Sequence, residues 1–406
     1  MVNKKIMILG ASILQLPAIL KSKSMGLQVI AVDMDKNAIG FKHSDVCLNI
    51  STVDIPKVIQ AAKEFEINGI FTLASDKPMR TVAAVSEELN IIGINRETAI
   101  NVTNKAEMRK VLREKDVPVP AFFKIETWSE YISAVKSFKN RFIVKPADNS
   151  GSRGIFLIED INNKENIAYA FNYSKENSHS GEIVVEEFMN GREVSVETLS
   201  FDGNNHIIAI TDKVTTGPPK FVEMGHSIPS QLSNQTKAEI EKVVSEALNA
   251  VGLTTGPSHT EVIITEDGPK IVELGARLGG DNITTHLVPL STGVDMVRCC
   301  IEIAMGKKPF LNSRVEMGSA IQYFNQGEGI IRNIKGLDDA KKIPGVEEIY
   351  FMKNINDKVV EISSSVDRLG YVIAKANTAT EAIDVCEKAR KRLYIDIQKP
   401  EIYERT

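Results

Sequence analysis

The chain has 406 residues, of which 43% are hydrophobic and 25% charged, and this composition argues against an intrinsically disordered protein. Because a single hydrophobic core rarely grows beyond about 250–300 residues, the length predicts at least two domains, and three are expected. The 49 Lys and Arg against 53 Asp and Glu give a net charge of -4, which disfavours a protein held to nucleic acid by a general basic field.

Neither a membrane protein nor a disulfide-rich secreted protein is indicated. No uncharged apolar run reaches the ~18 residues that a membrane-spanning helix needs. Gln15 and Pro17 interrupt the apolar stretch near the N-terminus and no cleavage pattern follows, so a signal peptide is not expected. The four cysteines form no C-x-x-C pair and are expected to be buried thiols in a reducing compartment. The sequence therefore predicts a cytoplasmic protein without membrane or nucleic-acid partners.

Residues 1 to about 100 alternate short apolar runs with helical patterns. Strands are expected at Ile6–Leu9, Leu27–Val32, Gly69–Leu73 and Ile91–Gly93, and helices at Pro17–Met25, Asp54–Glu66 and Arg80–Leu89. This alternation predicts a parallel sheet covered by helices on both faces, with ligands at the carboxyl ends of the strands.

The first turn of this region bears on a nicotinamide-binding alternative. Gly10-Ala11-Ser12 follows the first strand and Asp33 ends the second, as in a dinucleotide-binding domain. A full G-x-G-x-x-G is absent, so an ordinary strand-to-helix turn with a solvated Asp33 is favoured. An NAD-dependent dehydrogenase remains the alternative from a different class.

The central part of the chain mixes strands with helices. Strands are expected at Arg141–Lys145, Gly154–Ile158, Ile183–Glu187 and Glu193–Leu199, and helices at Asn104–Lys115, Thr236–Val251 and Gly293–Met305. The last ~90 residues show short strands, glycine-marked turns and a helix at Ala379–Leu393, which predicts a small α+β domain.

The hairpin formed by Val262–Ile264 and Lys270–Leu274 carries a pair of carboxylates. If its loop is Glu266–Gly268, Glu261 lies directly opposite Glu273, with Cβ atoms about 5 Å apart. Two like charges at a partly buried site require a proton or a cation between them, and a hard divalent ion that bridges to nucleotide phosphates is the natural solution. An exposed pair without metal is the alternative, and a register error of one residue would separate the two side chains.

Two basic residues near Gly-rich segments are suited to phosphate chemistry. Arg277 lies among small residues after Glu273, where a guanidinium would stabilise a transferred phosphoryl group, although a surface loop is equally compatible. Lys145 precedes a Gly- and Ser-rich turn at residues 148–154 that can direct backbone N–H groups at phosphate. This turn is not a P-loop, and read alone it is better explained as a flexible hairpin.

The segment from Glu186 to Glu193 ends one strand and begins the next. Glu186 could accept a hydrogen bond from an adenine amino group, the backbone near Met189 could meet the ring edge, and Glu193 could accept bonds from ribose hydroxyls. A charged strand edge without a ligand is the alternative.

These features occur in a fixed order over residues 103 to 293 and together resemble the ATP-grasp superfamily of carboxylate–amine ligases. Within it, Glu273–Asp281 and Thr292–Asp295 are most similar to the branch of amino-acid ligases and carbamoyl-phosphate-synthetase-like enzymes. Gly336, Pro344–Val346 and Asp367–Gly370 resemble the C-terminal domain of glycinamide ribonucleotide synthetases.

The resemblance implies a fold that is α/β and α+β in three domains. An N-terminal Rossmann-like parallel-sheet domain would span 1–102, a two-lobed ATP-grasp domain 103–312, and a small α+β domain 313–406. The lobes would lie at about 103–180 and 181–312.

The same resemblance implies residue roles. ATP would be bound by Lys105, Lys145, the loop residues Ser150, Gly151 and Ser152, and Glu186, Glu187, Met189 and Glu193. Arg277 and Lys145 would be catalytic, and Glu261 and Glu273 would bind Mg²⁺. The substrates would contact Lys213, Glu223, His226, Asp281 and Asn282. Many family members carry Asn two positions after the second metal carboxylate, where this chain has Gly275, and Asn282 is a candidate substitute.

The expected function is a Mg²⁺-ATP-dependent ligase that activates a carboxylate as an acyl phosphate and joins it to an amine, releasing ADP and phosphate. Small molecules would be its substrates, an amino acid first among them, and a homodimer is a family-level expectation. Phosphoribosylamine–glycine ligase or another purine-pathway relative is the first alternative. A non-catalytic ATP sensor is the second, and a biotin carboxylase has less support.

Overall fold

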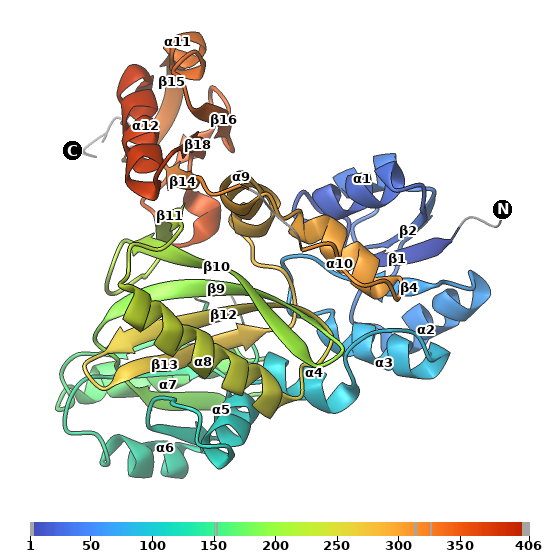
Figure 1. Cartoon of the computed structure of the whole chain (residues 1–406). Helices are drawn as coiled ribbons and strands as arrows, with labels where there is room; N and C mark the ends of the chain where they lie inside the picture. Colours follow the sequence, from blue (N-terminus) through green and yellow to red (C-terminus); the bar gives the residue numbers. More distant parts are fainter. Residues whose placement is uncertain (1–3, 150, 152, 312–314, 325–326, 400–406) are drawn as a thin grey trace, which may run out of the picture.

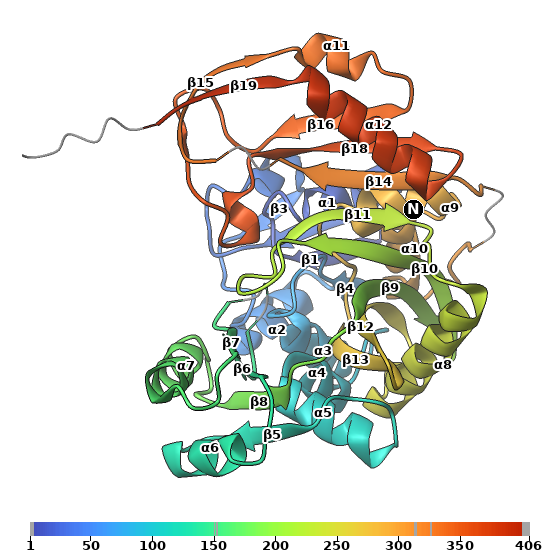
Figure 2. The same ribbon diagram turned by 90° about the vertical axis from the view of Figure 1, so that its left-hand side faces the viewer.

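The computed structural model describes residues 4–149, 151, 153–311, 315–324 and 327–399. Figures 1 and 2 show an N-terminal sheet with its helices, a central curved sheet, a lobe that carries α6 and α7, and a C-terminal region at the opposite end of the molecule from that lobe. The expected mixture of α/β and α+β architecture is confirmed.

The N-terminal region is a parallel sheet of order β3-β2-β1-β4. Its strands are β1 Lys5–Leu9, β2 Gln28–Val32, β3 Val46–Leu48 and β4 Gly69–Phe71. Its helices are α1 Leu16–Ser24, α2 Ile55–Glu64, α3 Met79–Leu89 and α4 Arg96–Thr103, with a 3-10 turn, η1, at Ile39–His43. The inner strands are buried on both faces, as a parallel sheet requires.

The prediction of a strand at Ile91–Gly93 is wrong, and β3 is instead the fourth strand of the sheet. Asn90 ends α3 in the left-handed conformation, and the Ile91 N–H then bonds back to the Ser86 carbonyl at 3.0 Å. A β-carbon at Gly93 would overlap the Ser86 hydroxyl, so this segment turns back along its own helix. β3 escaped the sequence analysis because it is three residues long and partly exposed.

The next region forms a four-stranded sheet of order β5-β8-β6-β7. It contains β5 Phe122–Ile125, β6 Phe142–Pro146, β7 Phe156–Ile158 and β8 Ile183–Glu187. The associated helices are α5 Lys105–Glu114, α6 Trp128–Val135 and α7 Lys164–Glu176. Tyr131, Phe142 and Phe171 belong to its core, which holds α6 and α7 against the sheet.

The largest sheet has eight strands in the order β13-β12-β9-β10-β11-β14-β18-β16. Its first five are β9 Arg192–Phe201, β10 Asn204–Thr215, β11 Glu223–Ile228, β12 Gly256–Thr265 and β13 Gly268–Gly275. The accompanying helices are α8 Asn234–Val251, the π-helical turn η2 Ile283–Leu287, α9 Val288–Thr292 and α10 Met296–Ala304. The apolar face predicted for α8 is buried in a core shared with the N-terminal sheet.

The C-terminal region completes this sheet and adds a smaller one of order β17-β15-β19. Its strands are β14 Gly318–Tyr323, β15 Gly329–Lys335, β16 Val346–Phe351, β17 Lys358–Val359, β18 Gly370–Ala376 and β19 Tyr394–Gln398. Its helices are α11 Leu337–Lys341, η3 Ser365–Asp367 and α12 Ala379–Arg392.

β11 pairs with β14, from Gly225 opposite Gln322 to Ile228 opposite Ser319. The sheet therefore runs across the domain boundary expected between 312 and 313, and the boundaries of all three domains stay predictions.

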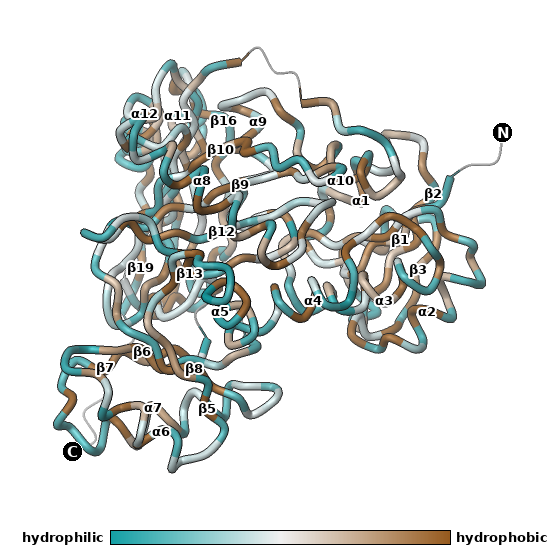
Figure 3. The backbone as a smooth tube through the Cα atoms, turned by 60° about the horizontal axis from the view of Figure 1, so that its bottom comes forward, coloured by the Kyte–Doolittle hydropathy of each residue, from teal (hydrophilic) through white to brown (hydrophobic). Residues whose placement is uncertain are grey.

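The distribution of apolar residues fits these layers. Figure 3 shows hydrophobic segments gathered at the inner strands and hydrophilic ones in the outer loops. All four cysteines are free, but Cys47 is exposed on the edge strand β3, so the expectation of four buried thiols is wrong for that residue. In the part of the chain that the structure describes, each helix is too short or too polar to cross a membrane.

The packing of β14 of the large sheet against α12 leads to a stability prediction. A β-carbon at Gly318 would overlap the backbone of Thr378 and Ala379, which cannot move without displacing α12. Gly318→Ala should lower the free energy of unfolding by about 1–3 kcal/mol, the usual cost of overpacking, in urea denaturation. Gly280→Ala is the control, since its nearest neighbour would lie at 3.8 Å. Equal stability of the two variants would contradict the prediction.

Candidate active site

The opposed carboxylates of the β12–β13 hairpin are confirmed, although the loop differs from the expected one. Thr265 pairs with Gly268 across a two-residue turn, and Glu261 lies opposite Glu273. A β-bulge next to Glu261 leaves Val272 as an extra residue, which offsets the shorter loop. Both glutamates are partly buried, with side-chain exposures of 22% and 28%.

Each of these carboxylates has a lysine partner. The Lys105 ammonium group donates to Glu273 Oε1 at 2.9 Å and to the Asn149 carbonyl at 2.6 Å. The Lys213 ammonium group donates to Glu261 Oε1 at 2.8 Å. Burial alone would raise the pKa of Glu261, but the charge of Lys213 and the neighbouring His259 hold it well below its usual range. The hairpin therefore carries an ionised Glu261 opposite Glu273, whose carboxylate is paired with Lys105.

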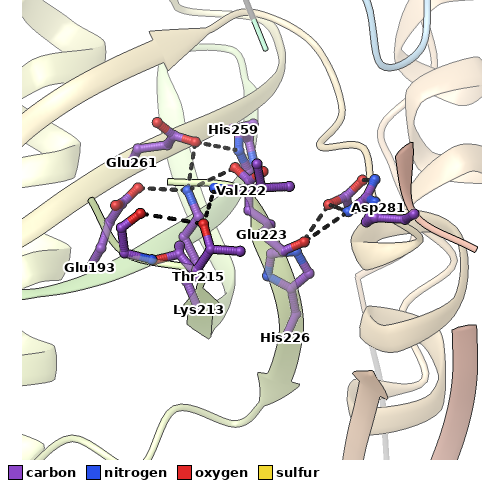
Figure 4. Close-up of polar contacts among 12 residues, drawn as sticks. Glu193, Lys213, Thr215, Val222, Glu223, His226, His259, Glu261 and Asp281 are labelled. Carbon is purple, nitrogen blue, oxygen red and sulfur yellow. Dashed lines mark hydrogen bonds and ion pairs between the residues drawn. The ribbon is translucent and has the colours of Figure 1, made fainter. Parts of the chain in front are cut away.

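Lys213 is shared among three glutamates, as Figure 4 shows. Besides Glu261, its ammonium group lies 2.6 Å from Glu193 Oε1 and 3.6 Å from Glu223 Oε1. It thus brings together residues that the sequence analysis assigned to ribose, metal and substrate. These separate assignments stay predictions.

Lys145 on β6 and Glu186 on the neighbouring antiparallel strand β8 form a buried ion pair. The Arg109 Nη2 atom also donates to Glu186, at 3.1 Å, and to the Val272 carbonyl at 2.6 Å. Burial, with the charges of Arg109 and Lys105, lowers the pKa of Lys145 despite its pairing with Glu186. Because this cluster has several cations around one carboxylate, its net positive charge suits an anionic ligand.

Arg109 was missed by the sequence analysis. It lies four residues after Lys105 on α5, so the two side chains share a helix face, and this spacing is the signal that would have found it. Arg109 is fully buried, and among the described residues its Nη1 atom has no hydrogen-bond partner. A buried donor of this kind is a further site for an acceptor group.

The Gly- and Ser-rich turn after β6 is fixed at its start. Asp148 accepts the N–H groups of His179 at 2.9 Å and Ser180 at 2.8 Å. Gly151 has a φ of 67°, and a β-carbon there would meet open space. Ser150 and Ser152, the other predicted loop residues, lie outside the described residues, so their role stays a prediction.

The other predicted adenine contacts lie beyond β8. Glu187 accepts from Lys270 Nζ at 3.1 Å, and Met189 is buried. The neighbouring Phe188 ring is covered by the Arg141 guanidinium at 4.2 Å. This edge therefore combines apolar and charged side chains, and its contacts with adenine stay predictions.

Arg277 is held by a residue of the N-terminal region. Its Nε and Nη2 atoms donate to the two carboxylate oxygens of Asp76 at 2.8 and 3.0 Å. Burial would raise the pKa of Asp76, but the charge and hydrogen bonds of Arg277 lower it below its ordinary value. Asp76 follows β4, at the sheet edge where ligands are expected, and this position is the signal that sequence reasoning left unused.

The predicted substrate residues His226 and Asp281 face the C-terminal region. His226 Nε2 lies 3.3 Å from Asp281, whose two oxygens accept from the Arg368 guanidinium at 2.7 and 2.8 Å. Burial opposes ionisation of Asp281, but these partners hold its pKa well below the usual range. The Tyr371 hydroxyl donates to Glu348 Oε1 at 3.4 Å, and Asn282 lies near it. Arg368 was not anticipated, and it ties this edge of the site to the C-terminal region.

A second unanticipated pair, His259 and Glu197, lies behind the hairpin. His259 Nδ1 is 2.5 Å from Glu197 Oε1. Burial lowers the pKa of His259, but the Glu197 carboxylate more than offsets this and raises it to about 9. The imidazolium Nε2 then lies 3.9 Å from Glu261, where it adds positive charge beside the carboxylate pair.

Asp33, the residue that the dehydrogenase alternative would use for ribose, serves the first turn. Its carboxylate accepts the N–H groups of Ala11 at 2.7 Å and Asp35 at 2.9 Å. The expectation of a simply solvated Asp33 is therefore wrong, since the carboxylate fixes the strand-to-helix turn.

The donor set of the hairpin suits Mg²⁺. Among the described residues, no group of three or more His, Cys, Asp or Glu could enclose a metal ion. Glu261 and Glu273 nevertheless supply two carboxylates, and Mg²⁺ is usually bound by one or two carboxylates together with substrate phosphates and waters.

Comparisons with known proteins agree with this geometry. Residues 138–285 match the ATP-grasp domain, and residues 322–398 match L-amino acid ligase C-terminal domain 2. The uncharacterized protein y4rH of Sinorhizobium fredii is 30% identical over 80% of this chain and 68% of that protein. A phosphoribosylamine–glycine ligase of Methanococcus maripaludis is 24% identical over 97% of this chain and 90% of that protein. The crystal structure of an L-amino acid ligase from Bacillus licheniformis has a TM-score of 0.83 at 24% identity, over 98% of this chain and 99% of that chain.

The chain therefore belongs to the ATP-grasp family of ATP-dependent carboxylate–amine ligases.

The buried cluster around Glu186 generates the second prediction. Arg109→Met removes one of two cations from a carboxylate that is 2% exposed. We expect a loss of about 3 kcal/mol in the free energy of unfolding, at the lower end for broken buried pairs because Lys145 remains. Lys110→Met, the exposed neighbour on α5, is the control in the same denaturation experiment. A loss below about 1 kcal/mol for Arg109→Met would show that the pair is not important for stability.

Proposed function

We propose that this enzyme phosphorylates the carboxylate of an amino acid with Mg²⁺-ATP and joins the acyl group to an amine. The observation that carries the proposal is the Glu261–Glu273 pair with a cation from each side: Lys105 at Glu273 and Lys213 at Glu261. Such a cluster is suited to holding a metal-bound triphosphate and to neutralising charge that develops during phosphoryl transfer.

The chemistry proceeds by positioning. The substrate carboxylate attacks the γ-phosphorus, the bond to the β-phosphate oxygen breaks, and ADP leaves. The amine then attacks the acyl carbon, phosphate leaves with the C–O bond electrons, and the amine nitrogen loses a proton. Lys105 and Lys145 hold the phosphates, and Arg277 faces the transferring group. When bound, Mg²⁺ supplies charge neutralisation between the carboxylates and the phosphates.

The environment of Glu186 supports a nucleotide beside this cluster. Arg109 Nη1 is a buried donor without a protein partner among the described residues, and leaving such a donor unpaired costs about 1–3 kcal/mol. A nucleotide acceptor group bound there offsets that cost. We assign to the turn after β6, through Asp148, Asn149 and Gly151, the exclusion of water, which would otherwise hydrolyse the acyl phosphate.

An amino-acid substrate is supported by charges of both signs on the β10–β11 side of the site. Glu223 lies on β11, where it binds the substrate ammonium group, and its side chain is 26% exposed. Arg368 supplies positive charge toward the substrate carboxylate, and His226, on the same strand as Glu223, lies beside it at Asp281. The match of residues 322–398 to an L-amino acid ligase domain favours the same substrate class.

Phosphoribosylamine–glycine ligase is the second candidate. The relative from Methanococcus maripaludis aligns over 97% of this chain, so its coverage includes all regions of the site. Both candidates activate an amino-acid carboxylate, and they differ in the amine. Phosphate release with glycine and phosphoribosylamine, but not with pairs of amino acids, would favour this candidate.

The proposed reaction predicts a strict requirement for Glu273. In Glu273→Gln the loss of one negative charge weakens metal and phosphate binding, and we expect phosphate release to fall by more than about 10²-fold. The assay measures phosphate from Mg²⁺-ATP with a pool of amino acids, against a blank without substrate. Glu266→Gln, in the exposed turn of the same hairpin, should keep wild-type activity. Normal turnover by Glu273→Gln would refute the metal assignment.

Glu223→Gln tests the substrate side. Removing the charge should raise the KM for the amino acid about 10–100-fold, the value of a hydrogen bond between charged groups. The KM for ATP should change by less than about threefold. Initial rates at varied amino acid and varied ATP separate the two constants, with Glu361→Gln, which is exposed, as the control. An effect on the KM for ATP alone would assign Glu223 to the nucleotide instead.

A further inference from the structure

Gly275 departs from the residue that many family members carry, and the structure gives a steric reason. A β-carbon at this position would lie 2.7 Å from Asp76 Oδ1 and 3.3 Å from Arg277 Nε. Real β-carbons essentially never lie within 3.0 Å of another heavy atom, so a β-carbon at position 275 would force the Asp76 carboxylate to move. Gly275 has no positive φ, so glycine is needed here for space and not for backbone conformation.

The atom that requires this space comes from a different part of the chain. Asp76 follows β4 of the N-terminal sheet, and 201 residues separate it from Arg277. The two side chains form a two-point contact at 2.8 and 3.0 Å, and both are largely buried, at 16% and 14% exposure. Paired hydrogen bonds of this kind fix the plane of a guanidinium as well as its position.

The remaining contact of Arg277 completes its orientation. Its Nη1 atom donates to the Leu278 carbonyl at 3.3 Å, so each nitrogen of the guanidinium has a protein acceptor. Glu273, the metal-binding candidate, also acts electrostatically on Arg277. Arg277 is therefore held in place beside the carboxylate pair before any substrate binds.

We propose that Asp76 is a positioning residue for the transfer step: it orients Arg277 toward the Glu261–Glu273 pair, and Gly275 provides the space that admits its carboxylate. The N-terminal region thereby contributes directly to the chemistry of the site. The proposal rests on the proposed function for its effect on turnover, but its steric part stands independently. It also requires that Asp76 and a side chain at position 275 exclude each other.

The first experiment asks whether Asp76 acts through Arg277. Asp76→Asn keeps the shape but turns one acceptor into a donor that faces the guanidinium, and should lower kcat about 10²-fold, the effect of a misplaced catalytic group. The KM for ATP should change by less than about threefold, because phosphate contacts remain. Asp76→Asn combined with Arg277→Met should be no slower than Arg277→Met alone.

The second experiment exchanges the two side chains. Gly275→Asn alone should lower both kcat and the melting temperature, because the new side chain collides with the Asp76 carboxylate. Adding Asp76→Gly removes the collision, so the double variant should lose less melting temperature than the sum of the losses in Gly275→Asn and Asp76→Gly. If the Asp76→Asn variant of the first experiment does not fold, the smaller Asp76→Ser replaces it in the comparison with Arg277→Met.

The outcomes separate this inference from the proposed function. Additive losses in the Asp76 and Arg277 variants, or a kcat of Asp76→Asn equal to wild type, would overturn the positioning role while leaving the ligase intact. If the wild-type protein releases no phosphate with any carboxylate and amine, the proposed function fails. The melting temperatures then decide the steric part: losses in Gly275→Asn and Asp76→Gly that simply add in the double variant would overturn it.

Discussion

The repulsion between Glu261 and Glu273 is the constraint on which the rest of the site depends. Two carboxyl groups directly opposite each other on a partly buried hairpin repel each other when both are charged, unless positive charge surrounds them. The protein meets this with Lys105 on one side and Lys213 on the other, and with a protonated His259 behind Glu261. The same charges that make the pair tolerable in the folded chain also suit a triphosphate with its metal ion.

These cations come from separate parts of the chain, which explains why the regions are packed so closely. Lys105 begins α5, Lys213 lies on β10, and Arg277 follows β13 but is fixed by Asp76 from the N-terminal sheet. The pairing of β11 with β14 then brings Arg368 to Asp281. The site therefore forms only when the N-terminal, central and C-terminal regions are assembled. A substitution at a contact between two of these regions can change turnover without contacting a substrate.

Local patterns predicted most of the fold, and long-range pairs were out of reach. Periodicity in the sequence predicts the helix α8 and the alternation of strands and helices before residue 100. The strand β3 has only three residues, which is too short to show a periodic pattern. The opposition of Glu261 and Glu273 was predicted correctly from a loop that was one residue too long, because the bulge at Val272 offset the error. Asp76 and Arg277 are 201 residues apart, and no local pattern links them.

Gly275 departs from the family pattern, and the residues that surround it in the structure change how this departure is interpreted. Read along the sequence, it stands where many family members carry the Asn that follows the second metal carboxylate. In the structure the space beside it is filled by a carboxylate that holds Arg277 in two places. Arg277 costs free energy to bury, as does Asp76, and two buried charges are retained at such a position only when they are paired. Gly275 is thus explained by the space that the Asp76 carboxylate needs beside Arg277, and its presence does not by itself point to a site without turnover.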